Sequence, residues 1–329
     1  MAEISLFEYL EKVNQLLDEE QYELAAQHCL HILQQFPRHV DTYQALAKAQ
    51  IGRHKTSDAI ELFQRVLSAD PNNLIAHIGL SDLYRMEMKT DLSHWHLQRA
   101  LDIEPYNPAI QDEYRKLTDQ DEEDAFRSAR LPLTPAAVAN IYLRGELYQQ
   151  ATAVLRQALA QFPDRVDLEL LLAESLWRDG QHVVSADVSR AVINRLPHCV
   201  IANAIIADIW MHANRIADAA PFLTRVQSLQ PMDEANVNLD SAVGHAFTAP
   251  GAPPLPERLL VNMLDETAVA PIVDEPTAEW VSEISFDRSD EPHTVEAAVH
   301  LDAEPEDAYD WLKGVTAELR GEAAAASPA

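Results

Sequence analysis

The sequence has little of three things, and each shortage excludes a class of protein. The 329 residues include only two cysteines, Cys29 and Cys199, too few and too isolated for a disulfide framework or a thiolate metal site. Only eight glycines occur, and none of them builds a glycine-rich phosphate loop. No apolar run approaches the roughly 18 residues of a membrane helix, and the first residues lack the features of a secretory signal. We therefore expect a cytoplasmic protein whose cysteines are ordinary core or loop residues.

Basic side chains are also scarce. The chain carries 25 Lys or Arg against 53 Asp or Glu, a formal charge of −28. Such a field repels phosphate backbones and anionic membranes, so we expect no nucleic acid and no membrane as partner. A neutral or basic protein partner fits better. Residues 250–329 alone hold 18 acidic and 4 basic side chains, which concentrates the charge near the carboxyl end.

No group of side chains indicates catalysis or metal binding. His94 and His96 are two residues apart, which places them on different faces of a helix. His28 and His31 could share a face, yet no third ligand lies at a suitable spacing. The sequence shows no set of a nucleophile, a general base and a residue that orients the base. We expect no catalytic residue, no metal and no cofactor, and an enzyme remains only a remote alternative.

A repeat is what the sequence does have. The stretch QFPRHVD at residues 35–41 returns as QFPDRVD at residues 161–167. This echo reflects either a duplicated block of three units or two instances of one pattern. A fixed period predicts a solenoid, in which each unit buries its apolar face against its neighbours. Prolines recur at steps of 34 residues in two sets, with 58 residues between the sets: Pro37, Pro71 and Pro105, then Pro163, Pro197 and Pro231.

Two columns of small residues follow from this frame. If each proline is the thirty-second residue of its unit, the units begin at Leu6, Val40, Leu74, Pro132, Val166 and Val200. The eighth position is then Val13, Ala47, Ser81, Ala139, Ala173 and Ala207. The twentieth position is Ala25, Ala59, Ser93, Ala151, Ser185 and Ala219. Small side chains let two helices approach closely where they cross.

A 34-residue helix-turn-helix unit with these columns and a terminal proline resembles the tetratricopeptide repeat. The resemblance covers residues 6–233 apart from the insertion, with departures at Gln50 in the eleventh column and Ser189 in the twenty-fourth. It implies an all-α, right-handed superhelix of about six repeats.

The same frame divides the chain into four parts. Residues 1–107 form a first block of three repeats, and residues 132–247 form a second block that ends in a closing helix through Leu239, Val243 and Phe247. Residues 108–131 hold a capping helix that starts after Asn107, followed by an acidic insertion, and the superhelix either continues or bends there. Residues 248–329 are acidic and proline-rich, which is typical of disorder. Within them, residues 255–264 could pack on the last repeat.

The resemblance also implies a concave groove formed by the first helix of each unit. A carboxylate clamp for chaperone tails is not expected, because only Asn14 agrees with that subset of the family. The groove positions predict a non-catalytic scaffold or adaptor that binds a peptide or helix of a partner protein. The expected groove residues are Asn14, Lys48, Asp82, Arg85, Asn140, Arg144, Glu174, Trp177, Arg178, Asp208, Met211 and His212.

The tail contains two short islands with apolar residues, one around Trp280 and one with helical spacing. An amphipathic helix that carries a tryptophan is the usual form of a groove-docking segment. This segment either has no partner, docks on another protein, or folds back into the chain's own groove as a self-regulating device. The helical island presents Trp311, Leu312, Val315 and Leu319.

Overall fold

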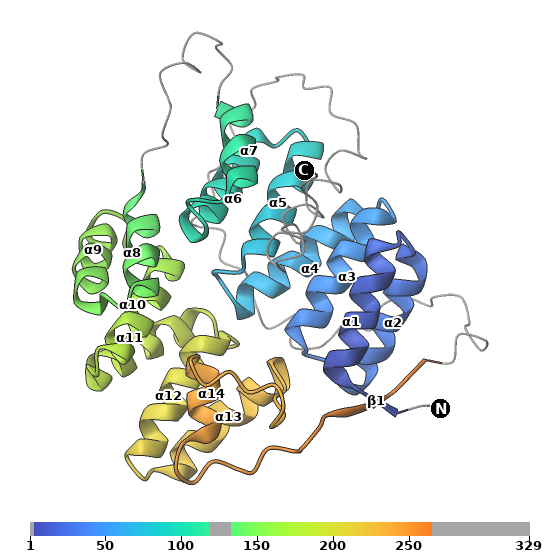
Figure 1. The fold of residues 1–329 in the computed structure, drawn as a ribbon. Helices are drawn as coiled ribbons and strands as arrows, with labels where there is room; N and C mark the ends of the chain where they lie inside the picture. Colours follow the sequence, from blue (N-terminus) through green and yellow to red (C-terminus); the bar gives the residue numbers. More distant parts are fainter. Residues whose placement is uncertain (1–2, 119–132, 265–329) are drawn as a thin grey trace, which may run out of the picture.

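The computed structural model describes residues 3–118 and 133–264, and this part of the chain is an array of helix pairs (Figure 1). The first helices of the six pairs are α1 (Leu6–Asp18), α3 (Val40–Gly52), α5 (Leu74–Met86), α8 (Pro135–Arg144), α10 (Val166–Arg178) and α12 (Val200–His212). The second helices are α2 (Tyr22–Gln35), α4 (Thr56–Ala69), α6 (Thr90–Ile103), α9 (Tyr148–Gln161), α11 (His182–Arg195) and α13 (Ile216–Leu229). Five of the six first helices begin at the predicted residue. The predicted all-α repeat fold is therefore confirmed.

The two columns of small residues form the contact between the paired helices. All twelve side chains are buried, with relative exposures of 0 to 2%. Where serine replaces alanine, its hydroxyl is satisfied locally: Ser81 Oγ donates to the carbonyl of Ser93 at 2.9 Å, and Ser185 Oγ donates to the carbonyl of Ala173 at 2.7 Å. A larger side chain in either column would force the helices apart.

The turn between the paired helices is the same in every unit. The fifteenth residue of each unit lies in the left-handed region, with φ between 57° and 76°. Only one of these residues is glycine, the type that adopts this conformation without a Cβ penalty. The six residues are Glu20, His54, Met88, Glu146, Gly180 and Asn214.

The terminal proline of a unit is tied to the helix that follows. Tyr43 Oη donates to the carbonyl of Pro37 at 2.7 Å, and Asn203 Nδ2 donates to that of Pro197 at 3.1 Å. Both donors are the fourth residue of their unit. The same bond recurs in α7 (Pro108–Thr118), where Gln111 Nε2 donates to the carbonyl of Pro105 at 2.6 Å. The predicted capping helix thus occupies the place of the next first helix.

The second block starts beside α6. Both α7 and α8 pack on α6, so the array branches there and does not run on through α7. Helix α8 begins at Pro135, three residues after the predicted start of the unit, because Thr134 caps it by accepting from the amide of Ala137 at 3.1 Å. At the same junction, Asp102 accepts hydrogen bonds from Thr134 and from Arg165. Burial raises the pKa of Asp102 to about 7, although the bond from Thr134 lowers it.

The closing helix is shorter than predicted. Helix α14 (Ala242–Thr248) begins only after Ser241, whose hydroxyl accepts from the amide of Gly244 at 3.0 Å. The Asn238 carbonyl accepts from the Ser241 amide in the preceding turn, and Leu239 is 58% exposed, so the prediction of a helical Leu239 is wrong. Val243 and Phe247 are buried as expected.

The interpretation that the chain is disordered from residue 248 is wrong for residues 249–264. This segment, here called the strap, runs from α14 across to the first repeat, where it appears as the orange trace in Figure 1. Strand β2 (Leu260–Asn262) pairs antiparallel with β1 (Glu3–Ser5), and the amide of Leu6 donates to the carbonyl of Leu259 at 2.7 Å. The expected contact with the last repeat is present but partial, since the carbonyl of Pro256 accepts from the amide of Glu234 at 3.0 Å. The strap therefore joins the two ends of the array.

Candidate functional site

The predicted groove residues of the first block are engaged within the chain. Lys48 is buried and Asn14 is half-buried. Arg85 donates to Asp82 at 2.9 Å and to Glu113 of α7 at 2.6 Å. Burial raises the pKa of Asp82 to about 8, while Arg85 opposes the shift. These side chains hold the capping helix on α5.

Two further predicted residues lie at the junction of the blocks. Asn140 Nδ2 donates to the carbonyl of Asp102 at 3.0 Å. Arg144 donates to the carbonyl of Ile103 at 2.9 Å and pairs with Glu104 at 2.8 Å. These contacts fasten α8 to the end of α6, a role that the position of the residues within a unit does not reveal.

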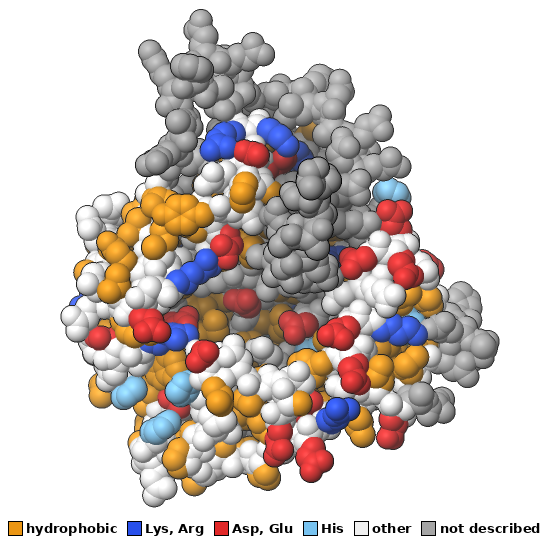
Figure 2. Space-filling view, in the orientation of Figure 1, with side chains coloured by type: hydrophobic (Ala, Val, Ile, Leu, Met, Phe, Trp, Pro, Cys, Tyr) orange, Lys and Arg blue, Asp and Glu red, His pale blue; other side chains and the backbone are white. Residues whose placement is uncertain are grey.

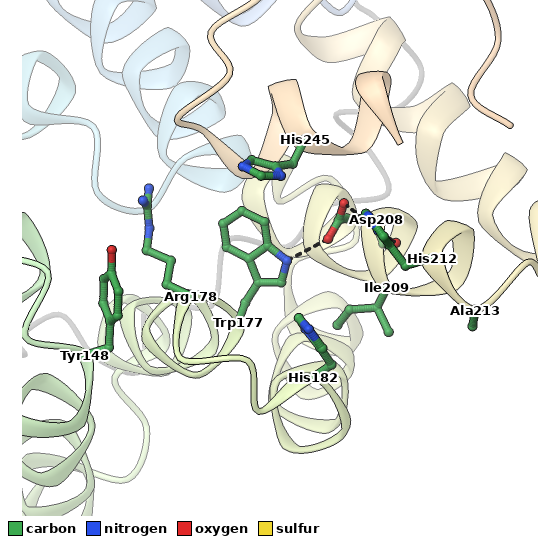
Figure 3. A pocket seen from close by; sticks show the side chains of 9 residues that line it. All are labelled: Tyr148, Trp177, Arg178, His182, Asp208, Ile209, His212, Ala213 and His245. Carbon is green, nitrogen blue, oxygen red and sulfur yellow. Dashed lines mark hydrogen bonds and ion pairs between the residues drawn. The ribbon is translucent and has the colours of Figure 1, made fainter. Parts of the chain in front are cut away.

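Four of the six remaining predicted residues, Trp177, Arg178, Asp208 and His212, line a pocket of about 620 Å³ in the second block (Figure 3). This volume is in the usual range of ligand sites. Here we call it the Trp177 pocket, after the side chain at its centre. Glu174 pairs with the lining residue Arg178, and Met211 is buried in the core. The pocket is lined by Tyr148, Trp177, Arg178, His182, Asp208, Ile209, His212, Ala213 and His245.

A hydrogen bond fixes the central tryptophan. Trp177 Nε1 donates to Asp208 Oδ2 at 2.8 Å, and both side chains are buried. His245 of α14 lies edge-on to the indole, with ring centroids 5.1 Å apart and an interplanar angle of 85°. The closing helix therefore contributes a wall of the pocket, and the indole is held in one orientation.

The charges in the pocket are unequally compensated. Arg178 donates to Glu174 Oε1 at 2.9 and 3.1 Å and to the carbonyl of Asp240 at 2.9 Å. By contrast, Asp208 Oδ1 is buried and accepts no hydrogen bond. It lies 3.2 Å from His212 Nδ1, which instead points at the backbone carbonyl of Asp208 at 3.0 Å.

One face of the molecule is hollowed and carries many acidic side chains (Figure 2). In Figure 2, acidic side chains border the central hollow, and histidine side chains gather over α11 and α12. His182, His212 and His245 are exposed at the rim of the pocket. An acidic border attracts cations and basic peptides.

Both thiols and the imidazoles of His77 and His96 are held in the core. Burial raises the pKa of both thiols, and that of Cys199 reaches about 12. His77 and His96 are buried with their Nδ1 atoms 3.0 Å apart, and burial lowers both pKa values to about 3. Thiolate and imidazolium forms are thus disfavoured at these positions at neutral pH.

Two tetratricopeptide repeat family profiles match the sequence, one over residues 16–76 and one over residues 137–191. The chain therefore contains tetratricopeptide repeats. Repeat arrays of this kind are protein-interaction scaffolds with extended binding surfaces. No curated protein matches the sequence. None of the helices in residues 3–118 and 133–264 has the length and apolar character needed to cross a bilayer.

Solved structures of similar fold include two bacterial proteins. A tetratricopeptide repeat protein from Parabacteroides merdae is 12% identical, with 73% of this chain and 98% of that chain covered and a TM-score of 0.34. A Pseudomonas aeruginosa pilF structure is 13% identical, with 67% and 89% covered and a TM-score of 0.29.

Reasoning from the sequence missed five residues of the pocket. Tyr148 and His182 are each the seventeenth residue of a tetratricopeptide unit, at the start of a second helix, so the repeat frame could have found them. Ile209 and Ala213 follow from their neighbours on α12. His245 comes from α14, outside the repeats, and no pattern in the sequence indicates its place. The predicted tail residues Trp280, Trp311, Leu312, Val315 and Leu319 lie outside the described residues.

Proposed function

We propose that this tetratricopeptide repeat protein is a non-catalytic adaptor that holds a peptide or helix of a neutral or basic partner protein at the Trp177 pocket. The observation that carries the proposal is a large, fixed aromatic side chain in a pocket of about 620 Å³, bordered by exposed polar groups. Buried tryptophan surrounded by a polar rim is the usual composition of an energetically dominant contact.

The pocket has the size and position for one anchoring side chain of a longer ligand. Its floor is formed by α10 and α12, and its rim is formed by the starts of α9 and α11 and by α14. A basic or neutral segment meets less repulsion than an acidic one from surfaces such as the acidic border of the hollow in Figure 2.

Site-specific photo-cross-linking tests this proposal. A photoreactive phenylalanine replaces His182, which is exposed at the pocket, and in a control replaces Glu61, whose side chain is 60% exposed on α4. After irradiation in the source cell, we expect a partner cross-linked at residue 182 and absent at residue 61. Cross-links of equal yield at both positions, or none at residue 182, refute the proposal.

A second candidate is self-regulation by the tail. The amide of Leu264 donates to Tyr9 Oη at 3.1 Å, so the strap delivers the remaining chain to the first repeat. Trp311 lies 47 residues further along the sequence, and a chain of that length can extend far enough to reach a groove on the same molecule. In the purified protein, a photoreactive group at residue 311 then cross-links to peptides of α10 or α12 within one chain. If no cross-link from residue 311 is found in peptides of α10 or α12, this candidate is rejected.

A further inference from the structure

We propose that the Trp177 pocket recognises a cationic side chain, arginine or lysine, and that Asp208 is its counter-ion. The inference rests on the proposed function and names the chemistry of the anchoring residue. It starts from Asp208, whose side chain is only 5% exposed and whose Oδ1 accepts no hydrogen bond.

A buried carboxylate with an empty acceptor is costly. Removing a charged group from water requires compensating hydrogen bonds or an opposite charge, and buried polar atoms are almost always paired. Asp208 has a single hydrogen-bond donor, the indole of Trp177 at 2.8 Å. Arg178 lines the same pocket, but its charge is already neutralised by Glu174 at 2.9 Å. Among the described residues, no Lys or Arg pairs with Asp208, and the imidazole of His212, 3.2 Å from Oδ1, is the only side chain that could carry an opposite charge beside it.

His212 occupies the position that a ligand cation would take. Its Nδ1 lies 3.2 Å from Asp208 Oδ1, and its side chain is 56% exposed. Because this imidazole is largely in solvent, it can turn away without breaking the core. A guanidinium or ammonium group in its place would donate a charge-assisted hydrogen bond to the carboxylate.

The walls of the pocket suit the rest of such a side chain. The stem of arginine or lysine packs well on apolar surface, and cations bind favourably over aromatic rings. Tyr148 supplies a ring and Ile209 an aliphatic contact, whereas the Trp177 ring already carries the guanidinium of Arg178 at 5.7 Å from its centroid. The net charge of −28 would favour the approach of basic segments to the protein.

The test uses three tripeptides that differ only in the central residue: acetyl-Ala-Arg-Ala-amide, its citrulline counterpart and its glutamate counterpart. Binding to the full-length protein is followed by the indole N–H resonance of Trp177, assigned with Trp177→Phe, because this proton lies on the bond to Asp208. We expect the arginine peptide to bind about 10-fold more tightly than the citrulline peptide, the difference typical of a bond to a charged group.

Two variants and a matched control complete the experiment. Asp208→Asn keeps an acceptor for Trp177 but removes the charge, so it should abolish the preference for arginine. His212→Ala removes the competing imidazole and should strengthen arginine binding, which keeps the test valid if Asp208→Asn is poorly folded. Asp218→Asn, at a carboxylate 49% exposed and paired with Arg215, should change nothing.

The outcomes separate the inference from the proposed function. Equal binding of arginine and citrulline, or preferential binding of glutamate, overturns the role of Asp208 while the pocket still accepts peptides. No binding of any peptide overturns both the inference and the pocket as a peptide site.

Discussion

Substitutions at the left-handed residue between paired helices should reveal how much backbone strain the repeats hold. Gly180 has φ of 76°, and a Cβ added there would meet no atom within 4 Å. Gly180→Ala therefore changes backbone conformational energy alone. A left-handed conformation costs an L-residue about 1–2 kcal/mol. Alanine also has fewer conformations than glycine in the unfolded chain, which stabilises the folded state by about 0.5–1 kcal/mol. The free energy of unfolding should therefore fall by about 1 kcal/mol or slightly less.

The neighbouring unit offers the reverse exchange. Glu146 has φ of 57° and is exposed, so Glu146→Gly should raise the free energy of unfolding by a similar amount. Urea unfolding followed by circular dichroism measures both, and the double variant should lie close to the original protein. If Gly180→Ala is neutral, or if Glu146→Gly destabilises the protein, the turn is not strained as the backbone angles indicate.

Three more changes test other features. Ser189 is buried and its hydroxyl has no hydrogen-bond partner, so Ser189→Ala should raise the free energy of unfolding by about 1 kcal/mol in urea titration, and a loss of stability would show that the hydroxyl is satisfied. Burial raises the pKa of Asp102 to about 7, well above the usual value for aspartate, so this group stabilises the folded state at low pH and that contribution is lost as the pH rises toward 7. Between about pH 6 and about pH 8 the original protein should lose about 1 kcal/mol relative to Asp102→Asn, and parallel pH profiles of the two proteins would contradict this. Val261 of the strap is 1% exposed, so Val261→Asp should release β2 and accelerate hydrogen exchange at the amide of Leu6, whereas unchanged exchange would mean that the strap adds no local stability.

The positions of the helices followed from the sequence because they depend on local spacing. Pro37, Pro71 and the later prolines fix a frame in which Ala25 or Ala173 must be small, and close helix packing leaves no other choice. The strap could not be found in this way, since Leu260 pairs with a strand some 250 residues earlier and both strands are three residues long. The turn conformation was also hidden, because the left-handed position holds glycine in only one unit.

Four of the nine residues that line the pocket are among the predicted groove residues. Trp177 and Asp208 follow from their positions on the first helices, as the resemblance implies. The hydrogen bond between them crosses from one unit to the next, and the edge-on contact with His245 depends on where α14 settles. Neither can be read from a single sequence, because residues far apart in the chain determine both. The contacts of Asn140 and Arg144 with α6 were hidden for the same reason.

An open array of repeats resembles a coil spring, in which small rotations between units add up to large changes of curvature. The strap connects the two ends of the array: the carbonyl of Pro256 accepts a hydrogen bond near the last repeat, and the carbonyl of Leu259 accepts one from the first repeat. Neither end of the array is therefore free to move independently. We expect bending motions to be confined to the junction at α6 and to the strap itself. A ligand wider than the central hollow could then bind only after β2 separates from β1 and the array opens. The stability of this short strand pair would therefore limit the size of the ligand.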